Sequence, residues 1–174
     1  MIGVLIIDMQ KAFLKRTPVE ERKKLIENHS KLLRFAYERE IPVITVRFSC
    51  YGKIISELVP LLKKLKSFTI NKYQNNGFIK MYGADPQIID SDIPQYQNRR
   101  LSGILKKKEI DQLILTGVQK RACVLNTAMG AKRRGYELFT SEELMNQRSE
   151  KEEWYYKNSN HFKTLSDLLE KLDK

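Results

Sequence analysis

Three side chains in the sequence are of the types that nucleophilic hydrolysis requires: the carboxylate of Asp8, the ammonium of Lys72 and the thiol of Cys123. A thiolate attacks electrophilic carbon, a carboxylate accepts and returns protons, and a nearby ammonium lowers the thiol pKa by its charge. Together they predict a covalent hydrolase site, provided that the fold brings them within hydrogen-bonding reach. They are far apart in the sequence, so the elements before them must position them.

Each of the three side chains follows an apolar segment that predicts a strand. Residues 1–7 form a continuous apolar run before the carboxylate, 68–70 precede Lys72, and 112–116 lead through a glycine turn to Cys123. Continuous apolar runs are typical of strands covered on both faces, as in a parallel sheet. Ligands bind outside the carboxyl ends of such strands. We therefore expect the sulfur at that edge of the sheet.

The rest of the chain continues this alternation of strands and helices. Further strands are predicted at 41–48 and 136–140, and helices at 17–39, 54–66, 101–108, 122–135 and 167–172. The alternation predicts an α/β fold with a mainly parallel sheet of about five or six strands and helices on both faces. The length of 174 residues predicts a single domain, 1–174.

Composition limits the classes of protein to consider. The hydrophobic content of 41% is typical of a globular protein rather than of a disordered chain. No apolar run approaches the roughly 18 residues of a membrane helix, so no membrane partner is expected. Two cysteines, Cys50 and Cys123, indicate a reducing compartment rather than a disulfide scaffold. We therefore expect a cytoplasmic protein.

The net charge of +11 raises the alternative of a basic nucleic-acid-binding module. The basic residues cluster at 63–66, 106–108 and 132–134. Each cluster falls at or near the end of a predicted helix, where cations complement the helix dipole. No aromatic platform is interleaved with them. A nucleic-acid partner is therefore disfavoured against a small-molecule substrate, which the cations near the cysteine suggest is anionic.

Two motifs resemble those of a known enzyme family. The segment VLIIDMQKAFL at 4–14 is similar to the opening motif of the isochorismatase-like cysteine hydrolases. The segments LTGV at 115–118 and ACV at 122–124 resemble the nucleophile motif of that family. The resemblance implies a doubly wound, Rossmann-like three-layer fold and a homo-oligomer.

The lysine of this family's middle motif can be placed in two registers. In one, Lys72 ends a strand and Phe78 is the aromatic residue six positions later. In the other, Tyr96 is the aromatic residue, which puts Asp90 in place of the lysine and leaves the triad incomplete. Lys72 is preferred because it follows an apolar strand segment. This choice makes 79–100 an insertion, either a lid or an interface arm.

The resemblance also implies a reaction. The cysteine would attack a small amide, carbamoyl or ureido compound and form a thioester, with an Asp-Lys-Cys triad. A non-proline cis peptide bond is implied between Val118 and Gln119, just before the nucleophile. These two residues and the backbone N–H groups of Ala122 and Cys123 are the expected oxyanion site.

Neighbours of the motifs supply the expected substrate contacts, with aromatic walls and cations for an anionic group. The candidates are Phe13, Arg47, Tyr73, Phe78, Lys120 and Arg121. Nicotinamidases of the family carry a metal-binding Asp/His cluster after the second strand, where this chain has RFSCYG at 47–52. That segment has no histidine or carboxylate, so no metal and no cofactor is expected. A catalytically silent binding protein of the same fold is the alternative.

Overall fold

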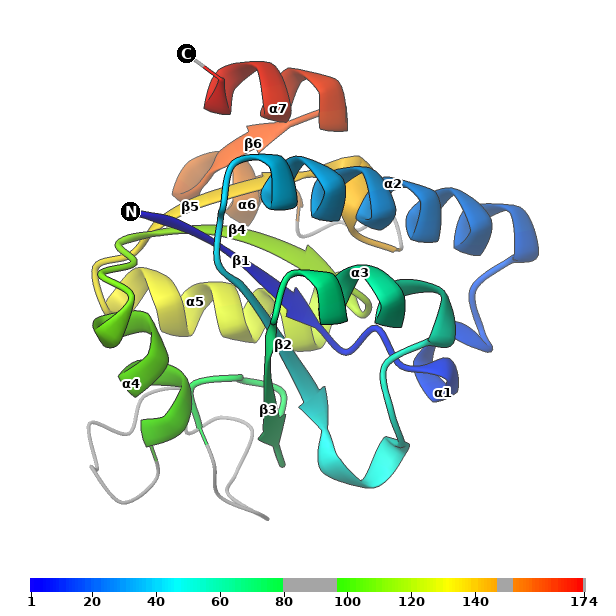
Figure 1. Cartoon of the computed structure of the whole chain (residues 1–174), viewed down its shortest axis with the longest axis horizontal. Helices are drawn as coiled ribbons and strands as arrows, with labels where there is room; N and C mark the ends of the chain where they lie inside the picture. The colour runs from blue at the N-terminus through cyan, green and yellow to red at the C-terminus, as the bar shows by residue number, and fades with distance from the viewer. Residues whose placement is uncertain (80–96, 147–151, 174) are drawn as a thin grey trace.

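We describe the protein from a computed structural model that defines residues 1–79, 97–146 and 152–173. These residues form a six-stranded sheet of order β3-β2-β1-β4-β5-β6, and all its strand pairs are parallel (Figure 1). The strands are β1 (Ile2–Ile7), β2 (Val43–Phe48), β3 (Phe68–Lys72), β4 (Gln112–Gly117), β5 (Glu137–Ser141) and β6 (Asn160–Phe162). The predicted parallel sheet is confirmed.

The strand β1 is covered on both faces of the sheet, which explains why its sequence has no polar residue. Val4 and Ile6 contribute to the hydrophobic cluster on one face of the sheet, whereas Leu5 and Ile7 contribute to the cluster on the other face. All four side chains are fully buried. Strands of a parallel sheet are covered on both faces, so both sets of alternating positions must be apolar.

Helices cover both faces, which confirms the three-layer prediction (Figure 1). One face carries α2 (Val19–Glu38), α3 (Val59–Lys64) and α7 (Leu165–Leu172). The other carries α4 (Arg99–Lys107), α5 (Leu125–Arg133) and α6 (Glu152–Asn158), and the short α1 (Lys11–Leu14) follows β1. The sequence pattern did not predict α6.

The predicted insertion 79–100 lies largely outside the described residues, as does Asp90. Its two ends are described and lie against each other. Ile79 and Gln97 form an antiparallel bridge, and the Asn98 N–H donates to the carbonyl oxygen of Phe78 at 2.7 Å. The side chain of Asn98 then caps the N-terminus of α4. The two described ends of the segment therefore lie side by side.

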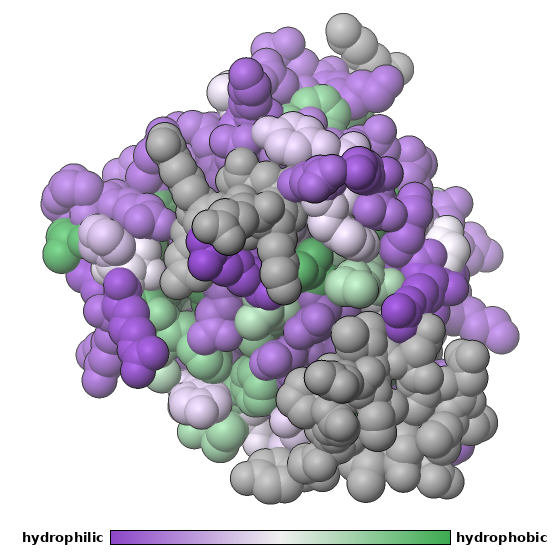
Figure 2. Space-filling model, turned by 180° about the vertical axis from the view of Figure 1, so that it is seen from behind, coloured by the Kyte–Doolittle hydropathy of each residue, from purple (hydrophilic) through white to green (hydrophobic). Residues whose placement is uncertain are grey.

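Among the described residues on the face shown in Figure 2, hydrophilic side chains predominate, with smaller apolar patches between them. No helix in the described part of the chain is long and apolar enough to cross a membrane.

Candidate active site

The site lies where the sheet changes direction. Strands β1 and β4 are neighbours, but β1 leads to α2 on one face and β4 leads to α5 on the other. Such a switch point opens a crevice outside the carboxyl ends of the strands. Asp8 follows β1, Lys72 ends β3, and Cys123 comes just after β4. The fold therefore brings all three predicted residues to the carboxyl edge of the sheet.

Gly117 allows β4 to end very close to β1. Its φ is +139°, and a Cβ built on it would lie 2.0 Å from the carbonyl oxygen of Ile7. That same oxygen accepts the N–H of Val118 at 3.0 Å. A larger residue at this position would separate the two strand ends, so the glycine allows Asp8 and the turn before Cys123 to lie close together.

The predicted cis peptide bond between Val118 and Gln119 is wrong for this structure, because the described residues contain no cis peptide bond. The chain turns instead through a left-handed Gln119, with φ 61° and ψ 60°. The Gln119 N–H donates to Asn146 Oδ1 at 2.7 Å, and Asn146 Nδ2 donates to Thr17 Oγ1 at 3.2 Å. These bonds satisfy the turn and fix its direction.

Cys123 lies in a wide turn that comes directly before a helix. Lys120–Val124 is a π-helical turn, and α5 follows it directly. The Val124 N–H donates to the Gln119 carbonyl oxygen at 3.3 Å, a bond across five residues. π turns within helices are frequent at functional sites. Cys123 lies at the start of the helical segment as predicted, but in a π-helical turn before α5 rather than in the first turn of an α-helix.

The expected oxyanion donors need a correction. The N–H of Val118 is bonded to Ile7, that of Gln119 to Asn146, and that of Ala122 to the Gln119 carbonyl oxygen at 2.9 Å. These three groups build the turn and have no N–H to offer a ligand. The backbone N–H of Cys123 is the remaining candidate of the four.

Asp8 and Lys72 form a buried ion pair across β2. Lys72 Nζ lies 2.7 Å from Asp8 Oδ2, and both side chains have an exposed fraction of 0%. β2 separates the two strands, and Phe48 at its end contacts both residues. The Phe48 N–H donates to Asp8 Oδ1 at 3.1 Å, and its ring centre lies 4.0 Å from Lys72 Nζ.

Two carbonyl oxygens complete the surroundings of the lysine. Lys72 Nζ donates to the carbonyl oxygens of Gln74 at 3.0 Å and Asn75 at 3.3 Å. With the carboxylate, the ammonium therefore has an oxygen partner for each of its three protons. A buried charge requires such partners. This environment holds a positive charge at a fixed position, which supports the Lys72 register of the triad.

The Cys123 thiol is fully buried beside the ion pair. Its Sγ lies 3.3 Å from Gln119 Oε1 and 3.5 Å from Asn75 Oδ1, and either amide oxygen can accept the single thiol proton. Asp8 and Lys72 are both close enough to influence the pKa of the thiol. The three side chains therefore form one cluster of a thiol, a carboxylate and an ammonium.

Burial dominates the titration of this cluster. It raises the pKa of the Cys123 thiol to about 12, although the Lys72 charge acts to lower it. Burial also raises the pKa of Asp8, and the ion pair with Lys72 offsets this only in part. Lys72 thus acts in the predicted direction but does not generate a thiolate. Burial therefore favours the protonated thiol over the thiolate.

An aromatic group lies beside the ion pair. Phe13 is half-buried, and its ring centre is 5.9 Å from that of Phe48 and 4.8 Å from that of Tyr51. Because Phe48 contacts Lys72, the predicted wall residue Phe13 is one ring away from the triad. Tyr51 is half exposed and was not predicted.

The other predicted substrate contacts are spread more widely. Arg47 Nε donates to Asn71 Oδ1 at 2.9 Å near the carboxyl end of β2. Tyr73 follows Lys72 and is exposed, and Arg121 is exposed on the π-helical turn. Lys120 is buried, with its Nζ 5.7 Å from the ring centre of Tyr155.

Phe78 is a correction to the predicted substrate contacts. It is fully buried and its ring stacks on Tyr136 at 5.9 Å, with the guanidinium carbon of Arg134 at 4.9 Å from its centre. Tyr136 precedes β5, and Arg134 ends α5. Phe78 therefore packs in the core toward the opposite edge of the sheet and does not form a wall of the catalytic site.

Several polar residues of the site were missed. Gln10 is buried, and its side chain accepts from the Phe48 N–H and donates to the carbonyl oxygens of Phe48 and Gly52. Asn75 and Asn146 contact the thiol and the turn before it. Gln10 stands in the opening motif, which was a usable signal. Asn146 follows β5 with nothing in its spacing to link it to the cysteine.

The described residues contain no group of three or more His, Cys, Asp or Glu side chains that could hold a metal ion. Independence of metals and cofactors stays a prediction.

With this geometry in place, comparison with known proteins identifies the family. The profile of the isochorismatase domain matches residues 3–167. A parallel α/β sheet with helices on both faces and a cysteine at the switch point is thus accompanied by a sequence match over nearly the whole chain. The chain belongs to the isochorismatase family of hydrolases.

Individual relatives are distant. Isochorismatase family protein 2A from Dictyostelium discoideum is 26% identical over 141 residues, which cover 78% of this chain and 62% of that protein. The chain thus spans less than two thirds of this curated relative.

Two solved structures share the fold. An isochorismatase-like hydrolase from Alkaliphilus metalliredigens has a TM-score of 0.74 at 18% identity, covering 98% of both chains. N-carbamoylsarcosine amidase from Thermoplasma acidophilum has a TM-score of 0.71 at 21% identity, covering 94% of this chain and 96% of that one.

Proposed function

We propose that the protein is a cysteine hydrolase that cleaves a small amide, carbamoyl or ureido compound through a thioester on Cys123. The observation that carries the proposal is the buried Asp8–Lys72 ion pair of 2.7 Å beside a buried thiol. Burying two charges is costly unless they are paired. A pair of this kind next to a nucleophile is accounted for by proton transfer during catalysis. The similar fold of an amidase that acts on a carbamoyl compound supports the substrate class.

The first half of the proposed reaction forms the thioester. Asp8 accepts the thiol proton as Cys123 Sγ bonds to the carbonyl carbon of the substrate. The backbone N–H of Cys123 donates to the developing oxyanion. As the C–N bond breaks, the leaving nitrogen takes the proton from Asp8 and departs as ammonia or an amine. Lys72 holds the carboxylate in position and offsets the negative charge of the thiolate.

The second half returns the free enzyme. Asp8 again acts as the base and takes a proton from a water molecule that attacks the thioester carbon. The C–S bond breaks, the sulfur recovers its proton from Asp8, and the acid product leaves. The raised pKa of Asp8 suits this role, because a carboxyl with a pKa nearer to neutrality both accepts and returns a proton readily.

The test uses a panel of small amides, ureas and carbamoyl compounds. Ammonia release would be measured together with the intact mass of the protein, which reveals an acyl adduct. We expect release and an adduct with the wild type and neither with Cys123→Ala. Cys50→Ala is the matched control, because Cys50 is the exposed cysteine of the chain and lies outside the triad.

Product formation by Cys123→Ala at the wild-type rate would overturn the proposal. Absence of both signals across the panel would favour the catalytically silent binding protein. Four further statements stay predictions: that 1–174 is one domain, that the protein is cytoplasmic, that it forms a homo-oligomer, and that its substrate is anionic.

A further inference from the structure

The three basic clusters of the sequence meet at the edge of the sheet opposite the triad. They lie at 63–66, 106–108 and 132–134, at the C-terminal ends of α3, α4 and α5. These helices run back to the strand beginnings, so we call this side the amino edge. The six-residue β4 separates it from the triad by about 20 Å. The catalytic proposal gives these cations no role.

A cavity of about 670 Å³ opens at the amino edge between α4 and the end of α5. This volume lies within the range of roughly 300–1,000 Å³ that is typical of sites for small molecules. Its lining includes Gln97, Ser102, Lys106, Arg134 and Tyr136. All five side chains carry hydrogen-bond donors, and two of them carry a positive charge.

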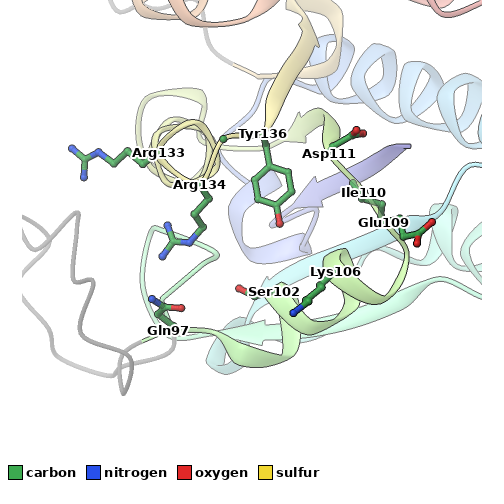
Figure 3. Close-up of a pocket in the computed structure, with 10 residues that line it drawn as sticks. Gln97, Ser102, Lys106, Glu109, Ile110, Asp111, Arg133, Arg134 and Tyr136 are labelled. Carbon is green, nitrogen blue, oxygen red and sulfur yellow. The ribbon is translucent and has the colours of Figure 1, made fainter.

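The charged side chains around the cavity point in different directions (Figure 3). The five donor side chains converge on a common space, whereas Glu109 and Asp111 point away from it. Asp111 Oδ1 is instead paired with the N-terminal ammonium at 2.5 Å. Among the described lining residues, the carboxylates are thus directed elsewhere, and two cations and three neutral donors face the space.

Two of the donors are held in place by packing. Arg134 Nη1 donates to the Gly130 carbonyl oxygen at 2.9 Å, and its guanidinium lies over the Phe78 ring. The other neighbour of that ring is Tyr136, stacked at 5.9 Å with an interplanar angle of 28°. Burial raises the pKa of Tyr136, which keeps its hydroxyl protonated and able to donate. Fixed donors lose little conformational entropy on binding.

From this arrangement we propose that the cavity at the amino edge binds the phosphate group of a small phosphorylated molecule. A phosphate has three terminal oxygens that accept several hydrogen bonds at once, and an arginine fork with a lysine beside it is a common way to hold one. The organic part of the ligand would occupy the remaining volume.

The partial negative charges at the helix C-termini oppose the positive charge of the basic clusters only weakly. The C-termini of α4 and α5 each place about half a negative charge at the amino edge. The clusters 106–108 and 132–134 carry six basic residues. Lys106 forms no ion pair with a described residue. Its charge at the cavity attracts an anion from a distance.

Calorimetric titration of the full chain with inorganic phosphate, ribose 5-phosphate and succinate would test the proposal. We expect both phosphates to bind and ribose 5-phosphate to bind more tightly, with succinate weaker by about tenfold because a carboxylate offers fewer acceptors. Binding must persist in Cys123→Ala, which separates this site from the thiol. That variant also makes the result independent of the proposed hydrolase activity.

Two substitutions have clean controls. Lys106→Met should weaken binding of ribose 5-phosphate about tenfold, whereas Lys107→Met removes the same charge from the same helix outside the cavity lining and should leave it within about twofold. Tyr136→Phe keeps the ring stack with Phe78 and removes only the hydroxyl, so it should weaken binding without lowering the melting temperature.

Equal weakening by Lys106→Met and Lys107→Met would overturn the proposal, because it would mean a response to net charge alone. Absence of binding of both phosphates would also overturn it. Tight, salt-sensitive binding of a short single-stranded oligonucleotide that ribose 5-phosphate fails to displace would replace it with an extended nucleic-acid surface.

Discussion

The two edges of the sheet use lysine in opposite ways. At the carboxyl edge, Lys72 is fully buried, paired with Asp8 and bonded to two carbonyl oxygens. At the amino edge, Lys106, Lys107 and Lys108 are exposed at the end of α4. The same side chain is a fixed charge in one place and a solvated charge in the other. The net charge of +11 therefore says little about catalysis, because burial and partners decide the role of each cation.

Backbone conformation shows the same contrast. Among the described residues, five non-glycine residues have a positive φ. Glu40, Lys66 and Glu109 follow α2, α3 and α4 at the amino edge, where left-handed residues commonly end helices. Asp8 and Gln119 follow β1 and β4 at the carboxyl edge, beside the nucleophile. Left-handed residues at such positions cost energy and are frequent at active sites.

The largest effect is expected for Lys72→Met at the carboxyl edge. It leaves Asp8 buried without its cation, so we expect the free energy of unfolding at pH 7 to fall by about 3–5 kcal/mol. The double variant Asp8→Asn, Lys72→Met removes both charges and should be more stable than Lys72→Met alone. Urea unfolding of the three proteins measures this. A loss below about 1 kcal/mol for Lys72→Met would contradict the buried ion pair.

A second buried group near the carboxyl edge predicts a pH effect. Burial lowers the pKa of His29 to about 4, from about 6.5 in an unfolded chain, and its Nε2 lies 2.6 Å from Thr116 Oγ1. Between these values the unfolded chain binds a proton that the folded protein does not. The contribution of His29 to the free energy of unfolding is thus fully present above pH 6.5. It falls by up to about 3 kcal/mol as the pH drops to 4.

The measurement compares urea unfolding of the wild type and His29→Gln from pH 7 to pH 4.5. The variant has no imidazole to titrate, so its free energy of unfolding should fall less steeply over this range. Parallel curves for the two proteins would show that His29 makes no contribution.

The two cysteines are expected to differ in their rates of alkylation. Cys50 is exposed, whereas Cys123 is buried with a thiol pKa of about 12. Because the thiolate is the reactive form, iodoacetamide at pH 8 should label Cys123 at least about 100-fold more slowly than Cys50. Mass spectrometry of Cys50→Ala and Cys123→Ala gives each rate separately. Equal rates would mean that the thiol is accessible and ionised in solution.

The smallest effect is expected at the amino edge. Lys107→Met removes an exposed charge without an ion pair to a described residue, so the free energy of unfolding should change by no more than about 0.5 kcal/mol. Urea unfolding beside Lys72→Met gives a direct contrast between the two edges. A loss comparable to that of Lys72→Met would show that the amino-edge lysines also have a structural role.

Much of the fold could be predicted because its signals are local. The apolar run of β1 and the helical spacing of the later segments set the alternation, and alternation implies a parallel sheet. The sequence pattern did not predict α6 because this helix has only seven residues, most of which are polar. The prediction of a cis peptide bond before the cysteine was also wrong. The left-handed conformation of Gln119 depends on a hydrogen bond with Asn146, which is distant in the sequence.

The sequence by itself determined which reactive side chain follows which element: a carboxylate after the first strand, a lysine at the end of the third, and a cysteine at the start of a helical segment. Only the tertiary structure decided that Asp8 and Lys72 pair across an intervening strand and that burial raises the pKa of the Cys123 thiol. It also decided that three separate basic clusters share one edge and that Phe78 belongs to the core. The reason is physical: periodicity is set by neighbours in the chain, whereas burial, charge pairing and pKa depend on residues that meet only after folding.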